Sequence, residues 1–157
     1  MIHELVSLNT HTLSKNYLIK HFKQILDENR EVAESLLLSL SRNRPELFEE
    51  LFKGFVETSK IELSSFEVVF SLITRVTISQ KHLDTFIDRC LSSCQKLSGP
   101  AQTKLLKSVC KFICQLIRKG YFDVTNKPEL WLTHCSQFKN NKHIAEFRDL
   151  INEKIKD

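Results

Sequence analysis

Apolar side chains recur every three to four residues along nearly the whole chain of 157 residues. This spacing places them on one face of an α-helix, whereas a half-buried strand would alternate strictly between apolar and polar residues. The two most regular stripes comprise Leu83, Phe86, Ile87, Cys90, Leu91, Cys94 and Leu97 and, further on, Leu105, Leu106, Val109, Phe112, Ile113, Leu116 and Ile117. The pattern therefore predicts helices that each bury one face, and we assign no segment to a strand.

Glycine and proline are scarce, with three residues of each type. A sandwich or barrel needs many turns rich in these residues, so we do not expect an all-β fold or one built on a glycine-rich phosphate loop. The few that are present mark helix ends. Pro45 suits the first turn of a helix, Gly99-Pro100 is expected to end the helix of the first stripe, and Gly120 occupies the position that follows a helix.

These signals predict about eight helices joined by short links. In the first half we expect helices over 13–26 and 30–40, after Pro45, and after Ser64, which has the spacing of a capping box with Glu67. The predicted fold is all-α, with consecutive helices in stacked antiparallel hairpins, either as a HEAT-like α-α superhelix or as a compact bundle. We divide the chain into an N-terminal tail, residues 1–13, and a single all-helical protein-interaction domain, residues 14–156.

Charge and hydropathy indicate which partners and which cellular compartment to expect. The net charge is +4 and the sequence pI is about 8.8, which permits an acidic partner without demanding nucleic acid. No apolar run reaches about 18 residues, so we expect no membrane span. The first residues lack the basic and apolar regions of a secretory signal, and the five cysteines show no framework spacing. We therefore expect reduced thiols in a cytoplasmic protein, with the nucleus as a second location.

Four of the cysteines raise the question of a metal site. Cys90 and Cys94 lie four residues apart, and so do Cys110 and Cys114 on the next predicted helix. Two antiparallel helices could present four thiolates to zinc, which prefers tetrahedral coordination. However, Cys90 and Cys94 share an apolar stripe, and free cysteine is among the most buried residue types. We favour core packing, with zinc binding and a redox role as weaker alternatives.

Other reactive residues give no catalytic pattern. His134 and Cys135 are adjacent, so on a helix their side chains point about 100° apart and cannot exchange a proton directly. Glu46, Glu49 and Glu50 fall in the first turns of a predicted helix, where negative charge favours the helix dipole. No nucleotide-binding, zinc-protease or nucleophile-elbow motif occurs. We expect no enzyme activity, catalytic residue, cofactor, metal or small-molecule ligand. The remaining histidines are expected on the surface, namely His3, His11, His21, His82 and His143.

Basic residues align along one predicted helix. Lys104, Lys107, Lys111 and Arg118 follow one another at helical intervals, and Lys119 extends the row. They make a polar ridge along which an acidic peptide or a phosphate backbone could lie. A merely solvated face opposite the apolar stripe gives the same pattern. RNA readers usually add exposed aromatic residues, and here most phenylalanines sit in apolar stripes. The ridge is our candidate partner-binding site, with an acidic protein favoured over RNA.

Several segments follow one another in an order that resembles a known family. They are Phe66-Glu67-Val68-Val69, Phe86-Ile87-x-x-Cys90-Leu91-x-x-Cys94-Gln95, Lys104-Leu105-Leu106-Lys107-x-Val109-Cys110-x-Phe112, Leu116-Ile117-Arg118 and Cys135-x-x-Phe138, with Ala145 downstream. In this joint order and spacing, the chain over about residues 24–151 resembles the C-terminal domain of the eleventh subunit of the Ccr4-Not mRNA deadenylase complex. Cys114 departs from the family pattern, and so does the connection from Tyr121 to Pro128.

The resemblance implies an all-helical, non-catalytic domain that acts in mRNA deadenylation and decay and in post-transcriptional and translational regulation. It also implies partners, namely the tenth subunit and the large scaffold subunit of the complex, and adaptor proteins that dock on the domain. In the family, a part that precedes this domain makes the contacts to the other subunits. We therefore expect an adaptor-docking domain of a Ccr4-Not subunit. The alternative is a helical RNA-binding domain that uses the basic ridge.

Overall fold

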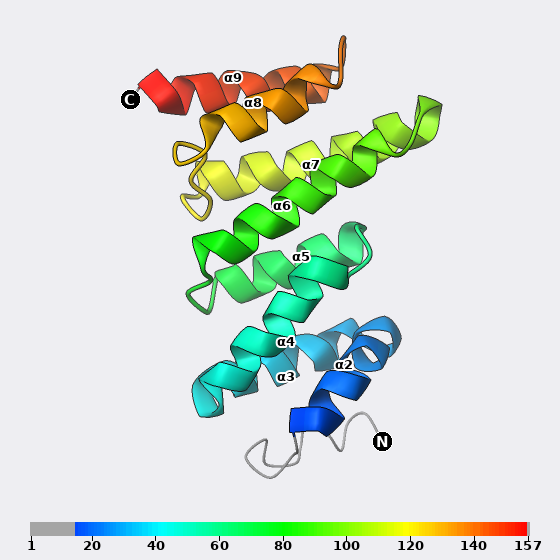
Figure 1. Cartoon of the computed structure of the whole chain (residues 1–157), viewed down its shortest axis with the longest axis vertical. Coiled ribbons are helices and arrows are strands. Elements are labelled where there is room, and N and C mark those ends of the chain that lie inside the picture. Colours follow the sequence, from blue (N-terminus) through cyan, green and yellow to red (C-terminus); the bar gives the residue numbers. More distant parts are fainter. Residues whose placement is uncertain (1–14, 157) are drawn as a thin grey trace. The chain divides into compact units, whose positions relative to one another are not determined.

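The computed structural model describes residues 15–156, and these residues form eight helices without a strand (Figure 1). None of the described helices is both long and apolar enough to cross a membrane. The predicted all-α class with about eight helices is confirmed, whereas the predicted tail, residues 1–13, lies outside the described residues. The helices are α2 (Lys15–Glu28), α3 (Arg30–Asn43), α4 (Pro45–Thr58), α5 (Leu63–Ile73), α6 (Gln80–Gln95), α7 (Gly99–Arg118), α8 (Pro128–Ser136) and α9 (Lys142–Lys156).

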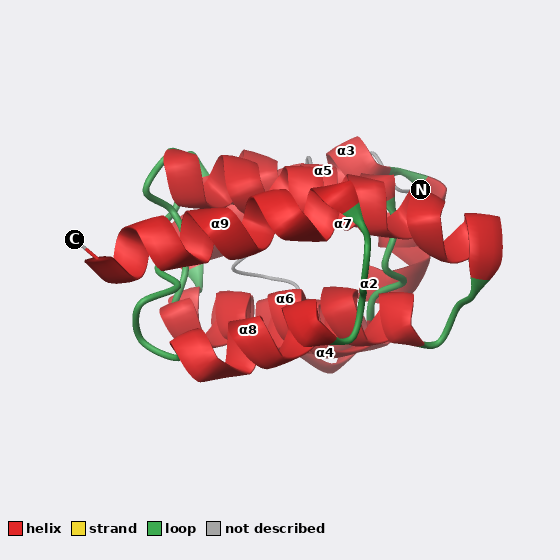
Figure 2. Ribbon diagram, turned by 90° about the horizontal axis from the view of Figure 1, so that it is seen from above, coloured by secondary structure: helices red, strands yellow, loops and turns green. Residues whose placement is uncertain are grey.

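The chain divides into two compact units, which we describe separately. Among the described residues, the first comprises 15–60 and 64–82, and the second comprises 61–63 and 83–156. In the first unit, α3 packs against both α2 and α4, and Figure 2 shows α3 and α5 in one layer with α2 and α4 in the other. In the second unit, α9 packs against both α7 and α8. Here α7 and α9 form one layer, and α6 and α8 form the other (Figure 2). This division does not test the single interaction domain over 14–156, which stays a prediction.

Proline and glycine begin and end several helices, largely as their chemistry predicts. Pro45 lies in the first turn of α4, where its missing N–H costs no helical hydrogen bond. Gly120 follows α7 with a φ of +79°, a conformation that glycine adopts without steric cost. Its N–H donates to the carbonyl of Ile117, and the N–H of Tyr121 donates to the carbonyl of Leu116. These two bonds form a Schellman motif, which satisfies carbonyls that the helix end would otherwise leave unpaired.

Two expected helix boundaries are wrong. The helix of the first stripe ends at Gln95, and Gly99 and Pro100 begin α7 instead of ending α6. Leu97 therefore lies in the turn between the helices and is 39% exposed, although its spacing placed it in the core. The side-chain amide of Gln102 donates to the carbonyls of Cys94 and Leu97, which holds this turn in place.

The second boundary concerns the start of α5. This helix begins at Leu63, so Ser64 lies in its first turn rather than before it. The Glu67 carboxylate accepts a hydrogen bond from the Arg30 guanidinium of α3. The hydroxyl of Ser65 donates to the carbonyl of Lys60. The start of α5 is therefore tied to other parts of the first unit, and Glu67 makes a contact between helices that a local motif cannot reveal.

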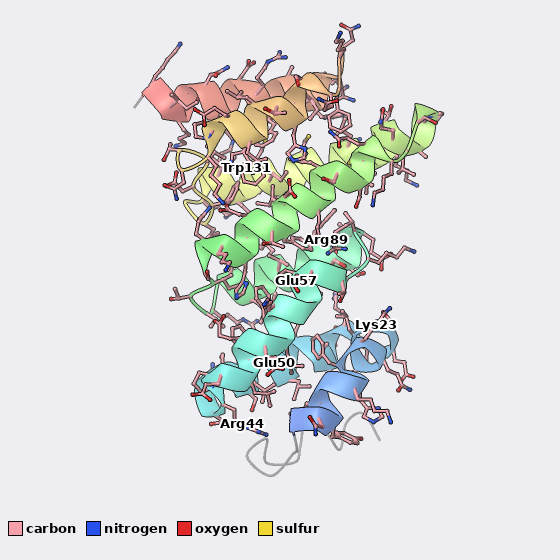
Figure 3. All side chains as sticks on the ribbon, in the orientation of Figure 1. Lys23, Arg44, Glu50, Glu57, Arg89 and Trp131 are labelled. Atoms are coloured by element: carbon pink, nitrogen blue, oxygen red, sulfur yellow. The ribbon has the colours of Figure 1, made fainter. Side chains whose placement is uncertain are left out.

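Aromatic side chains fill the cores of both units. In the first unit, Phe52 stacks on Phe48 with ring centroids 5.6 Å apart. In the second unit, Phe86 of α6 meets Phe112 of α7 edge to face at 6.0 Å. Trp131 of α8, labelled in Figure 3, is fully buried, and its ring meets that of Phe122 edge to face. Edge-to-face and offset contacts of this kind stabilise aromatic pairs beyond the burial of their area.

Replacement of Phe112 by alanine tests this packing. We expect Phe112→Ala to lower the free energy of unfolding by about 3–5 kcal/mol, because the change leaves a cavity beside Phe86. Urea denaturation followed by circular dichroism measures the loss. Lys119→Ala is the control on the exposed end of the same helix, and it should change stability by less than about 0.5 kcal/mol. Equal stability of the Phe112→Ala protein and the unmodified chain would contradict the packing.

Two glycines provide a matched test of backbone conformation. An added Cβ would meet no atom within 4 Å at either Gly54 or Gly120, so only the backbone distinguishes the two sites. We expect Gly120→Ala to destabilise the protein by about 1–2 kcal/mol, because alanine is strained at positive φ. Gly54→Ala lies within α4 and should stabilise it by about 0.5–1 kcal/mol. Midpoints of urea unfolding give both values, and shifts of the same sign would contradict the prediction.

Candidate functional site

The predicted basic ridge begins with three lysines on the outer side of α7. Lys104, Lys107 and Lys111 are all exposed, and at about 100° per residue they fall within about 60° of one another around the helix. The opposite side of α7 holds buried apolar residues such as Leu106 and Ile113. Burial of that apolar side fixes which way the lysines point. We call Lys104, Lys107 and Lys111 the α7 lysine face.

The α7 lysine face carries charge that its surroundings do not balance. The sequence of α7 contains no Asp or Glu. None of the ion pairs within residues 15–156 involves Lys104, Lys107 or Lys111. Like charges three and four residues apart on a helix repel one another. As far as the described part of the chain goes, the face is therefore a compact group of positive charges without a carboxylate partner.

The end of the predicted ridge differs from its beginning. Nη2 of Arg118 donates to Oε1 of Glu146 on α9 at 2.7 Å, and this hydrogen bond raises the pKa of the Arg118 guanidinium. The two side chains are 54% and 53% exposed, so the pair contributes little stability. Lys119 follows the last residue of α7 and is exposed. Lys104, Lys107 and Lys111 thus lie on one side of α7 as expected, whereas Arg118 contacts the carboxylate of Glu146. Partner binding by these residues stays a prediction.

All five cysteines lie in the core of the second unit, which confirms that they contribute to packing. Burial raises the pKa of the thiols of Cys94 to about 12 and of Cys114 and Cys135 to about 11, from an ordinary value of 9.0. For Cys90 and Cys110, too, burial is the largest cause of a raised pKa. A thiol must lose its proton to attack a substrate or to ligate a metal. Among residues 15–156, no three Cys, His, Asp or Glu side chains are arranged to hold a metal ion.

Two of the histidines, His82 and His134, make contacts between helices. His134 of α8 is buried, and its Nε2 lies 2.6 Å from Oδ1 of Asp88 on α6. His82 lies 2.8 Å from Glu49 and meets the ring of Phe52 edge to face. Of the histidines expected on the surface, His21, His82 and His143 are half-buried, so each is still partly exposed; His3 and His11 lie outside the described residues. These contacts depend on helix packing, which residue spacing alone does not reveal.

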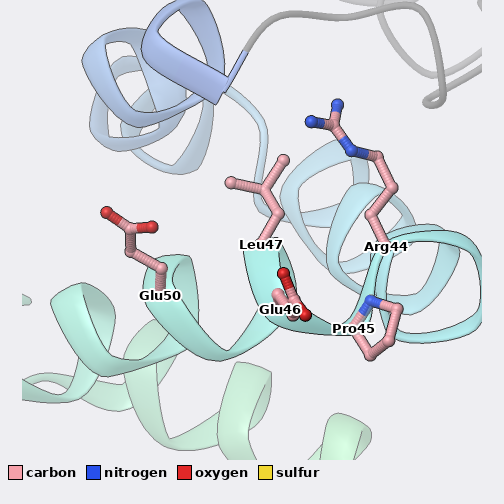
Figure 4. A pocket seen from close by; sticks show the side chains of 5 residues that line it. All are labelled: Arg44, Pro45, Glu46, Leu47 and Glu50. Carbon is pink, nitrogen blue, oxygen red and sulfur yellow. The ribbon is translucent and has the colours of Figure 1, made fainter.

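A cavity of about 330 Å³ lies at the corner between α3 and α4 (Figure 4). Its lining residues are Arg44, Pro45, Glu46, Leu47 and Glu50. It combines one cation with two carboxylates, and Glu46 occupies the first turn of α4, where negative charge favours the helix dipole as expected. Its formal charge is only −1 and its lining residues include no nucleophile, so the α7 lysine face, with three like charges, is the stronger candidate site.

The chain matches the model of a known protein family. The family model described as CCR4-NOT transcription complex subunit 11 matches residues 26–154. This range begins in α2, ends in α9, and contains the α7 lysine face and all five cysteines. The match therefore extends over most of the chain and includes nearly all of the described core.

The buried thiols lead to a prediction about chemical labelling. Raising a thiol pKa from 9.0 to about 11 lowers its thiolate fraction near neutral pH by about 100-fold. We therefore expect Cys94, Cys114 and Cys135 to react at least about 100-fold more slowly with iodoacetamide in the folded protein than in urea. Mass spectrometry of the labelled peptides measures each rate, and the unfolded chain serves as the control. Fast labelling of any of the three thiols in the folded protein would contradict their burial.

Proposed function

The chain belongs to the family of CCR4-NOT transcription complex subunit 11, and on this premise we propose that it is a non-catalytic protein-interaction domain of that complex. The observation that carries the proposal is the match of the family model to residues 26–154. The domain would act in mRNA deadenylation and decay, and through them in post-transcriptional and translational regulation. Its proposed mechanism is to receive adaptor proteins, while other subunits of the complex perform the chemistry.

The chemistry of the interior supports a non-catalytic role. The five thiols are buried and their pKa values are raised, so they are protonated and unreactive near neutral pH. The buried His134 contacts Asp88, and its neighbour Cys135 is held protonated in the core. Apart from Ser59 and Ser65, the other buried residues in the described part of the chain are apolar. Such an interior suits a stable scaffold that presents its surface to other proteins.

The surface favours protein partners over single-stranded RNA. No phenylalanine or tyrosine is exposed, and neither is the tryptophan. The least buried of these rings, those of Tyr17, Phe70 and Tyr121, are half-buried. Proteins that bind single-stranded RNA usually stack bases on exposed aromatic rings. We therefore propose adaptor proteins, the tenth subunit and the scaffold subunit of the complex as partners. The proposed location is the cytoplasm, where mRNA decay takes place, with the nucleus as a second location.

Affinity purification and a tethered reporter test the proposed function together. We expect the tagged chain, expressed in cells, to recover subunits of the CCR4-NOT complex. Tethered to a reporter mRNA, it should shorten the poly(A) tail and the half-life of that mRNA. The purified chain alone should release no nucleotide from polyadenylated RNA. The same chain without the tether is the control for the reporter. Failure to recover any subunit, together with an unchanged reporter half-life, would refute the proposal.

A further inference from the structure

We propose that the α7 lysine face docks an acidic amphipathic helix of a protein partner. This inference deepens the proposed function and rests on it, because it gives the interaction domain a specific contact surface. It narrows the predicted ridge to the three lysines of the face. Arg118 is left out because its guanidinium already contacts Glu146.

Unbalanced charge is the first reason for the assignment. Arg30, Arg118 and Lys127 each lie close to a carboxylate on a neighbouring helix. The α7 lysine face has no such contact within residues 15–156, and the helix that carries it has no acidic residue. Like charges at this spacing repel one another, and an anion brought by a partner would relieve that repulsion. Carboxylates of a partner would supply that charge.

Spacing is the second reason. Lys104 and Lys111 are seven residues apart, which corresponds to about 10 Å along the helix at 1.5 Å per residue. Carboxylates placed at intervals of three and four residues on a second helix repeat with the same rise. A partner helix that lies along α7 can therefore face each lysine with one carboxylate. Charge complementarity of this kind orients the partner helix and speeds its association more than it increases the affinity.

The start of α7 adds an apolar contact to the same surface. Pro100 precedes Lys104 by four residues, so it lies on the same side of the helix, and it is exposed. Leu97, in the adjoining turn, is 39% exposed, and the amide of Gln102 holds the backbone of that turn. Apolar side chains of an amphipathic partner can pack here while its carboxylates face the lysines. This combination of charged and apolar contacts favours a protein helix, because a nucleic-acid backbone presents phosphate charges but no apolar side chains that could pack here.

Two synthetic peptides of equal composition test the proposal on the purified whole chain. Each has about 20 residues, long enough to form a helix. One carries glutamates at intervals of three and four residues beside a leucine stripe, and the other carries the same residues in shuffled order. Isothermal titration calorimetry at low salt measures binding. We expect the patterned peptide to bind at least about tenfold more tightly than the shuffled one, and added salt to weaken its binding.

Two charge-reversal variants locate the site. Lys107→Glu/Lys111→Glu should weaken binding of the patterned peptide by about tenfold or more. The matched control is Lys139→Glu/Lys142→Glu, which changes the net charge equally at exposed lysines near the turn between α8 and α9 and should leave binding unchanged. Circular dichroism checks that both variants remain folded, as expected for exposed side chains.

Three results would overturn the proposal. Equal binding of both peptides, or equal loss in both variants, would indicate attraction by net charge alone. Displacement of the patterned peptide by an oligouridine of similar length would assign the face to RNA. The assay uses only the purified chain and peptides. A failure here therefore does not bear on the recovery of complex subunits. Failed recovery together with an unchanged reporter half-life would refute the proposed function, and successful peptide binding would then still support the docking surface.

Discussion

Burial of one apolar stripe per helix is the interaction on which the rest of the structure depends. Removing these stripes from water provides the main driving force for packing, and it sets the rotation of every helix about its own axis. In α7 the buried side includes Leu106, Val109 and Ile113, and the polar side must then face outward. The position of the lysines is thus a consequence of the core. A site of this kind needs no separate loop to hold it, because the helix that carries it is itself anchored along its length.

The same packing distributes charge unevenly over the surface. Arg118 and Glu146 pair where α7 and α9 lie side by side, and Arg30 pairs with Glu67 between α3 and α5. Nearer the start of α7, the lysines of the face have no carboxylate in contact with them within the described residues. This face is the surface that we propose as a contact for another component of the complex. The buried thiols contribute to the packing of the second unit.

Local patterns predicted the helices well because each stripe records which side of a helix is buried. They placed Pro45 and Gly120 correctly, since both act through their own backbone geometry. They failed at Leu97, whose spacing continues the stripe although the helix has already ended. The exposure of the lysines followed from the stripe opposite them. The pairing of Arg118 with Glu146 could not be predicted, because it joins residues that only tertiary packing brings together.

The distribution of two residue types has a practical consequence for folding studies. The only tryptophan, Trp131, and all five cysteines belong to the second unit. Intrinsic tryptophan fluorescence and thiol accessibility therefore both report on the unfolding of that unit and give no information on α2–α5. A single fluorescence transition would give no information on whether the first unit melts at the same temperature. Far-ultraviolet circular dichroism, which senses every helix, is needed beside it to establish whether the two units unfold as one cooperative body.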